Sequence, residues 1–157
     1  MTKLSVEERL QRLEDIEEIR QLKAQYAEAC DDDHNGDRVI ALFVPDGVWH
    51  QVSLPPCNGH AEIRAFMMNI RESGRLRNSS HMFTNPMIEV DGDNANGHWK
   101  FVMVYTGNAP DDTTQYHRIL GYYDEEYVRV DGAWMFKSLR VTVVENNAYS
   151  VEDSKFD

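Results

Sequence analysis

The 157-residue sequence is poor in cysteine and in basic residues, and it contains no long apolar run. Its two cysteines, Cys30 and Cys57, fit neither a disulfide framework nor a paired zinc motif. A net charge of −11 argues against nucleic acid and anionic membrane as partners, because phosphates are bound by clustered Lys and Arg. No stretch approaches the roughly 20 apolar residues that a membrane-spanning helix requires. The opening residues MTKLSVEERLQ lack an apolar signal core, so we expect a cytoplasmic protein.

Motifs for nucleotide cofactors and for a serine nucleophile are also missing. No GxGxxG follows a predicted strand, and neither GxxxxGK[ST] nor GxSxG occurs. We therefore expect no cofactor.

The chain length and the 41% of hydrophobic residues predict one domain over residues 1–157, with an ordered core over about 6–147. Ser5 and Glu8 have the spacing of a capping box, and an amphipathic pattern then reaches to about residue 30. The apolar side of this helix consists of Leu10, Leu13, Ile16, Ile19, Leu22 and Tyr26. Two shorter helices are predicted over residues 37–43 and 60–73, with a strand over 44–53 between them.

From residue 80 onward the helical period changes to an alternating one. Strands are predicted over 81–90, 96–107, 115–130 and 133–144, joined by turns rich in Asp, Asn and Gly. Consecutive strands of this kind pair antiparallel. We therefore predict an α+β fold, in which a cone-shaped, curved antiparallel sheet packs on a long N-terminal helix and two shorter helices.

The run YAEACDDDHNGD places three carboxylates side by side at the end of the first helix, which costs stability unless something relieves their repulsion. Asp31, Asp33 and Asn35 fit the first half of a calcium-binding loop. The twelfth position, which requires a bidentate Glu, is Leu42. The six histidines show no zinc-ligand spacing such as HxxxH. We therefore expect no metal site.

Acid–base chemistry is the other use of the acidic run. Tyr26 lies on the inward side of the first helix, Asp31 lies near its end, and His81 opens a strand on the same face as Phe83. A half-buried carboxylate fixes the tautomer of a neighbouring histidine and makes it a better base. Each residue alone also fits a plain structural role, as a packed Tyr, a solvated Asp or a packed His.

Alternation within the strands predicts the lining of a pocket. Trp99, Phe101, Met103 and Tyr105 share one strand face, and Trp49 and Phe66 are expected to add to it. Such a lining suits an aromatic or polycyclic ligand, although an aromatic stripe of period two is also ordinary core. His117 is a candidate second polar group of the same pocket, although no feature of the sequence favours it over His98. Arg140 is expected on the strand face of Trp134 and Phe136, where it would anchor an anionic group or pair with an acidic residue.

Five segments together resemble the SnoaL-like, scytalone-dehydratase-like branch of the nuclear transport factor 2-like superfamily. They are IEEIRQLKAQYAEACD, DGVWHQ, HAEIRAFM, SSHMFTNPMIEVDGDNANGHW and GYYDEEYVRVDGAWMFKSL, and the likeness extends from about Val6 to Val144. The sequence looks especially similar to bile-acid dehydratases and is more distantly similar to hexachlorocyclohexane dehydrochlorinase.

The resemblance implies a cone-shaped barrel around an apolar pocket, with Asp31 and His81 as its catalytic pair. Asp31 would orient His81, His81 would remove a proton, and Tyr26 would hydrogen-bond the substrate or the leaving group. Asp32 is the alternative to Asp31, because loop lengths differ by one residue among relatives. The dehydrochlorinase has Lys in place of Tyr26, which disfavours dehalogenation, and bile-acid dehydratases have an acidic residue in place of Met103.

These patterns favour a cofactor-independent lyase that expels water or breaks a carbon–carbon bond in a small hydrophobic substrate, either aromatic or alicyclic. An isomerase or epoxide hydrolase of the same fold is the nearest alternative, and a non-catalytic small-molecule-binding module is another. Apolar residues on the outer face of the sheet predict a homodimer or homotrimer. These residues are Val102, Val104, Val141 and Val143.

Overall fold

The computed structural model describes residues 4–109 and 113–150. In chain order the elements are α1 (Val6–Asp31), α2 (Gly36–Ile40), β1 (Phe43–Gln51), β2 (Cys57–Asn58), α3 (Gly59–Ser73), β3 (Arg77–Asp91), β4 (Asn94–Asn108), β5 (Thr114–Val130) and β6 (Ala133–Ser150). β6 continues past the expected end of the ordered core at about residue 147, and residues 151–157 lie outside the described part.

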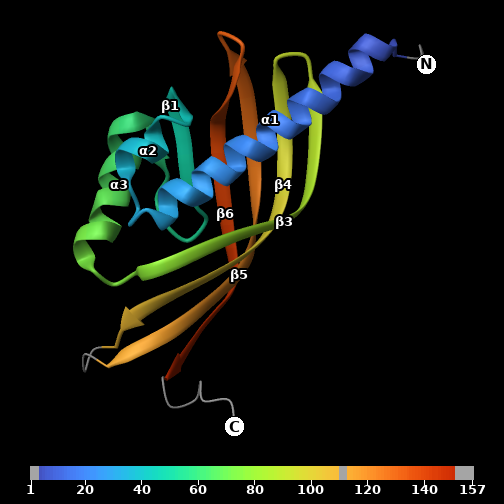
Figure 1. Cartoon of the computed structure of the whole chain (residues 1–157). Coiled ribbons are helices and arrows are strands. Elements are labelled where there is room, and N and C mark those ends of the chain that lie inside the picture. Colours follow the sequence, from blue (N-terminus) through green and yellow to red (C-terminus); the bar gives the residue numbers. More distant parts are fainter. Residues whose placement is uncertain (1–3, 110–112, 151–157) are drawn as a thin grey trace.

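The strands form one curved sheet in the order β2-β1-β6-β5-β4-β3, with α1 crossing its concave side (Figure 1). β3 to β6 make the predicted antiparallel meander, and the α+β prediction is confirmed. The sheet is nevertheless mixed, because β1 pairs parallel with β6. Alternation reveals that a segment is a strand but not which distant strand it pairs with, so this pair was not predicted.

The sheet curves because its long strands contain irregular positions. The pairing of β5 with β6 shifts register between Leu120 and Gly121, where an added Cβ would collide with the backbone carbonyl of Thr142. Only glycine allows this close approach of two backbones. The bend lets the sheet close over the helices and leave a hollow between the layers.

α1 begins with the predicted capping box, in which Ser5 and Glu8 each accept the other's backbone N–H. Its second half packs on the sheet with Ile19, Leu22 and Tyr26 buried. Leu10 and Leu13 were expected on the same buried side, but 55% and 65% of their surface is exposed. The reason is positional, because the first turns of α1 project beyond the strands (Figure 1).

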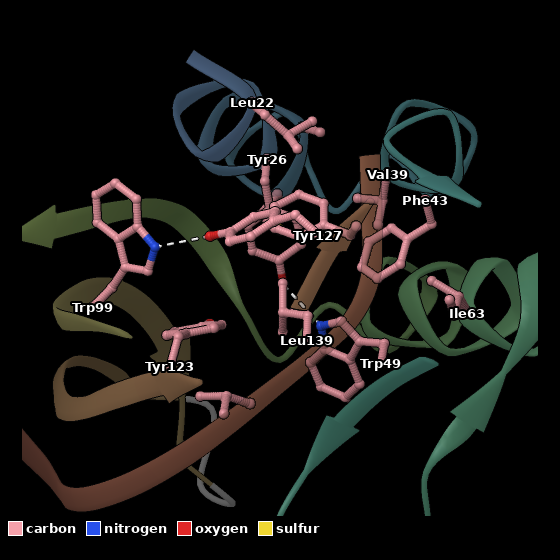
Figure 2. Close-up of a cluster of buried hydrophobic side chains, with 14 of the residues drawn as sticks. Leu22, Tyr26, Val39, Phe43, Trp49, Ile63, Trp99, Tyr123, Tyr127 and Leu139 are labelled. Carbon is pink, nitrogen blue, oxygen red and sulfur yellow. Dashed lines mark hydrogen bonds between the residues drawn. The ribbon is translucent and has the colours of Figure 1, made fainter. Parts of the chain in front are cut away.

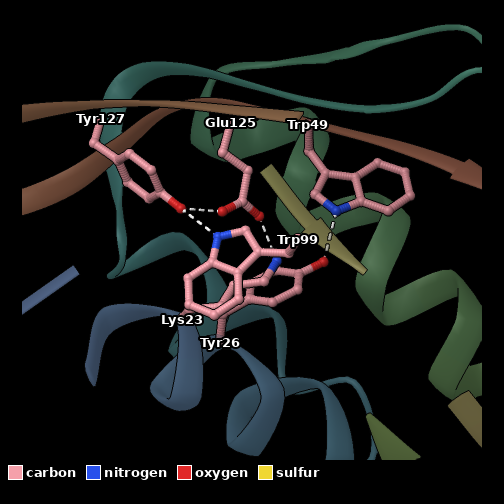
Figure 3. Close-up of polar contacts among 6 residues, drawn as sticks. All are labelled: Lys23, Tyr26, Trp49, Trp99, Glu125 and Tyr127. Carbon is pink, nitrogen blue, oxygen red and sulfur yellow. Dashed lines mark hydrogen bonds and ion pairs between the residues drawn. The ribbon is translucent and has the colours of Figure 1, made fainter. Parts of the chain in front are cut away.

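A buried polar network fixes α1 to the sheet (Figure 3). Lys23 forms an ion pair with Glu125, the same carboxylate accepts the hydroxyl of Tyr127, and Tyr127 accepts the indole N–H of Trp99 at 3.0 Å. The Lys23 ammonium also lies 3.8 Å from the ring centroid of Phe83. Burial lowers the pKa of Lys23 below its usual value, an effect that Glu125 opposes. A buried pair of this kind specifies one position of the helix more than it adds net stability.

Candidate active site

An apolar cavity of about 110 Å³ lies between α1, α3 and the inner face of the sheet. Four of the residues predicted to line a pocket do line it: Trp49, Phe66, Phe101 and Met103. Other members of the wall are Met67, Ile70, Leu76, Ile119, Val141 and Val143. The volume is close to that of cavities of about 150 Å³ that hold a single benzene ring. It therefore suits one ring better than a fused polycycle.

The repulsion within the acidic run at the end of α1 is relieved because each carboxylate has a different partner. Asp31 turns inward to His81, Asp32 pairs with Arg38 at 3.0 Å, and Asp33 pairs with Arg71 at 3.2 Å. The three acidic side chains therefore point away from the helix end in different directions. Asp32, the alternative partner for the histidine, is engaged elsewhere.

Asp31 and His81 form a close pair at the wall of the cavity. The Asp31 carboxylate receives three hydrogen bonds: from His81 Nδ1 at 2.6 Å, from the His81 backbone N–H at 2.9 Å and from the Ser79 hydroxyl at 2.8 Å. The backbone N–H is available because β3 is an edge strand, with β4 on its other side only. The end of α1 therefore caps the sheet edge and orients the histidine at once.

The charge state of Asp31 sets the tautomer of His81. Burial opposes the charge of Asp31, but the hydrogen bonds from His81 and Ser79 outweigh burial and hold the pKa of the carboxyl below its usual value. A charged carboxylate requires the proton to be on Nδ1, which leaves the lone pair on Nε2. Within residues 4–109 and 113–150, Nε2 has no hydrogen-bond partner, and the ring lines the cavity. His81 is thus arranged to accept a proton from a bound molecule.

Tyr26 lies at the centre of the buried aromatic cluster, against the same cavity (Figure 2). Its hydroxyl accepts the indole N–H of Trp49 at 2.8 Å and also contacts the Cys30 thiol. Burial raises the pKa of Tyr26 well above its usual value, so the phenol is neutral. Burial likewise raises the pKa of Cys30 to about 12. The predicted hydrogen bond from Tyr26 to a substrate stays a prediction.

Two further predicted residues point inward but are outside the cavity wall. Trp99 is buried beneath α1, where its indole donates to Tyr127. His117 stacks on Tyr105, with ring centroids 4.5 Å apart, toward the far end of β4 and β5. Alternation predicted the face of Trp99 correctly but not its distance from the cavity along the strand, whereas no pattern in the sequence had indicated where His117 lies.

Arg140 lies on the opposite face of the sheet from the cavity, so its expected orientation is wrong. One extra residue in β6 lies between the pairs Tyr127–Phe136 and Glu126–Ser138. This bulge reverses the alternation, because two residues of one strand face one residue of the other. Arg140 consequently borders an outer groove with Asp124. The same reversal turns two valines predicted on the outer face, Val141 and Val143, into the cavity.

His34 is a cavity residue that the sequence did not reveal. Its side chain is 5% exposed, and its ring centroid lies 6.1 Å from that of His81. Only its place directly after DDD marked it, and a histidine in that position is typical of a solvated turn.

Among the residues that the structure describes, no group of three or more His, Cys, Asp or Glu is placed to hold a metal ion. None of the described helices is both long and apolar enough to cross a membrane.

Comparison with known proteins places these features in context. The profile of the SnoaL-like domain matches residues 11–140, which confirms the resemblance inferred from the sequence. A hexachlorocyclohexane dehydrochlorinase of type 2 has a similar structure, with a TM-score of 0.79 at 21% identity over 90% of this chain and 93% of that chain.

Two similar structures come from Novosphingobium aromaticivorans. A protein provisionally named scytalone dehydratase has a TM-score of 0.75 at 22% identity, over 93% of this chain and 97% of that one. A nuclear transport factor 2-like protein with a cystatin-like fold has a TM-score of 0.72 at 23% identity, over 94% of each chain. At such identities the likeness shows a shared fold. No curated protein matches the chain.

Proposed function

Since the chain belongs to the SnoaL-like domain family, we propose that it is a cofactor-independent lyase, which eliminates water from, or cleaves a carbon–carbon bond in, a small aromatic or alicyclic substrate. The observation that carries the proposal is the hydrogen bond between Asp31 and His81 at the wall of an apolar cavity. The similar dehydrochlorinase and the protein named scytalone dehydratase, by the reactions in their names, support elimination chemistry.

In the proposed reaction His81 acts as the base and Asp31 positions it. Nε2 of His81 takes a proton from a carbon of the substrate, and the electron pair left behind forms a carbon–carbon double bond as the neighbouring C–O bond breaks. The departing hydroxide takes a proton from the imidazolium, so water leaves and His81 returns to its starting state. Proton transfer by a positioned side chain contributes about 10²- to 10⁴-fold to such a rate.

The apolar lining of the cavity favours this chemistry. Trp49 and Phe66 pack at a tilt on one side, with ring centroids 4.6 Å apart. Phe101 and Met103, which are 4% and 5% exposed, close another side. Tyr26 closes the wall as a neutral phenol that can support the leaving oxygen. A low-dielectric surrounding strengthens the interaction of Asp31 with the imidazolium that forms during proton removal.

We also propose that the protein is cytoplasmic and forms a homodimer or homotrimer through the outer face of the sheet. In the described part of the chain, Val104 and Tyr116 on that face are 39% and 44% exposed. Apolar side chains of this size gain stability when a second copy covers them.

A thermal-shift screen of single-ring aromatic and alicyclic alcohols would identify ligands, because a bound ligand raises the melting temperature. Compounds that bind are then assayed by mass spectrometry for loss of water or for cleavage. We expect His81→Ala and Asp31→Asn each to lower turnover at least 100-fold, with Asp32→Asn as the matched control.

The outcomes separate the alternatives. Turnover within a few-fold of the wild type in both variants would rule out the lyase mechanism. Dependence on the carboxylate alone would favour isomerase or hydrolase chemistry, in which Asp31 itself acts as the base. Tight binding of a ligand that is never converted would indicate a binding module.

A further inference from the structure

His34 is a polar cavity residue with a buried ring nitrogen that has no partner. The hydroxyl of Tyr26 has Trp49 and Cys30 as partners, and His81 is bonded to Asp31 through Nδ1, which leaves its Nε2 as the proposed base. Among the residues that the structure describes, Nδ1 of His34 is the buried side-chain atom without a hydrogen-bond partner. Such atoms are rare in folded proteins, because a buried polar group without a partner costs about 1 to 3 kcal/mol.

The backbone holds His34 in this position against its own conformational preference. Its φ is 51°, in the left-handed region that costs a non-glycine residue free energy. Two hydrogen bonds of the helix end fix it there, from His34 N to the Cys30 carbonyl at 2.9 Å and from Asn35 N to the Ala29 carbonyl at 3.1 Å. The termination of α1 therefore directs a histidine into the cavity three residues after Asp31, where a smaller polar residue would turn at lower cost.

The surroundings keep His34 neutral. Burial, together with the neighbouring His81, lowers the pKa of His34 from its usual value of 6.5 to about 4. A neutral imidazole carries one N–H and can donate it without competing for the proton that His81 removes. The two histidines differ in their partners, because the ring of His81 is hydrogen-bonded to the Asp31 carboxylate, whereas Nδ1 of His34 has no partner among the described residues.

We propose that His34 binds the carbonyl oxygen of the substrate and donates an imidazole N–H to the negative charge that develops there when His81 removes the proton. The inference rests on the proposed elimination and narrows its substrate to a β-hydroxy carbonyl compound with one ring. The carbonyl oxygen and the carbon next to the carbonyl group are two bonds apart. This span fits between the rings of His34 and His81, whose centroids are 6.1 Å apart.

The step balances without any co-reactant. His81 Nε2 takes the proton from the carbon next to the carbonyl, and the electron pair moves to the oxygen to give an enolate held by His34. When the carbonyl re-forms, the electron pair makes the carbon–carbon double bond and expels the β-hydroxyl, which leaves as water with the proton from His81. A donor placed at the developing oxyanion stabilises the transition state more than the ground state.

Binding of 4-nitrophenolate and 4-nitrotoluene to the purified protein tests the inference without any turnover. The two probes share ring and size, but only the first carries an oxyanion. We expect the wild type to prefer 4-nitrophenolate by about 10- to 100-fold in Kd, as measured by titration calorimetry. His34→Gly, which suits the positive φ, should reduce the preference at least tenfold. Asp33→Gly is the matched control, because Asp33 also has a positive φ of 52° and points away from the cavity.

The same titration separates this inference from the proposed function. His81→Ala should keep the preference while losing turnover. Equal affinity of the wild type for both probes, or a preference that disappears in His81→Ala and survives in His34→Gly, would overturn the role of His34. Should His34→Gly fail to fold, ¹⁵N NMR of the wild type decides the question. The His34 ring nitrogens should shift with 4-nitrophenolate and not with 4-nitrotoluene, and unchanged signals would reject the inference.

Discussion

Asp31 binds His81 at two points at once, through the ring Nδ1 at 2.6 Å and through the backbone N–H at 2.9 Å. The contact joins residues 50 positions apart in the sequence. One carboxylate therefore attaches the end of α1 to the edge strand β3 and sets the tautomer of the histidine. The free energy of unfolding and the proposed chemistry both depend on this carboxylate. Its interactions with His81 can therefore be measured by unfolding experiments before any substrate is known.

Asp31→Asn should destabilise the fold at neutral pH by about 1.5 to 3 kcal/mol, because three hydrogen bonds lose their charged acceptor. The folded-state pKa of Asp31 is depressed, so its contribution is present above the unfolded value of about 3.9 and is lost as pH falls through the folded value. Urea unfolding at pH 7 and in acid measures both effects. Asp32→Asn, at the exposed neighbour, should change stability far less, and an equal loss in both variants would contradict the prediction.

His34 predicts a separate pH dependence at higher pH. In the unfolded chain the His34 imidazole is protonated below about pH 6.5, whereas in the folded chain it is protonated only below about pH 4. The contribution of His34 to the free energy of unfolding is therefore fully present above about pH 6.5. It decreases as the pH falls and is about 3 kcal/mol smaller at pH 4. His34→Asn, which suits the positive φ, should flatten this part of the curve of unfolding free energy against pH. Parallel curves for the two proteins would show that His34 is not the group responsible.

The buried pair of Lys23 and Glu125 allows a double-mutant cycle. Lys23→Met alone should cost about 3 to 5 kcal/mol, because it leaves the Glu125 carboxylate buried without its partner. Adding Glu125→Gln removes the stranded charge, so the double variant should be less destabilised than the sum of the two single variants. Chemical denaturation measures all three. Arg118→Met, at the exposed Arg118–Glu145 pair, is the control and should have a much smaller effect. Additive losses would mean that the pair is not coupled.

The sequence predicted those parts of the site that depend on uninterrupted periodicity. The helical pattern placed Tyr26 on the inward side of α1, and alternation within β4 placed Phe101 and Met103 in the cavity. The role of Asp31 came from the family resemblance, with Asp32 as the alternative. Prediction failed where one residue breaks the period. The bulge in β6 turned Arg140 outward, and no short-range pattern announces an inserted residue.

His34 escaped prediction for a different reason. Its inward position follows from the left-handed backbone after the helix end, which a sequence of Asp, His and Asn permits but does not require. The parallel pairing of β1 with β6 is likewise a long-range choice. Local patterns identify elements, whereas sites assembled by turns and distant pairs need the structure.

The proposed oligomer is tested by mass in solution. Size-exclusion chromatography with light scattering should give two or three times the chain mass of 18.2 kDa. Val104→Glu should lower that mass, because a charge on the outer sheet face opposes its burial against a second copy. Leu13→Glu is the matched control: Leu13 is also an exposed apolar residue, but it lies on α1, away from the sheet. A monomeric wild type would reject the oligomer, and a loss of mass in Leu13→Glu alone would move the interface from the sheet to the helix.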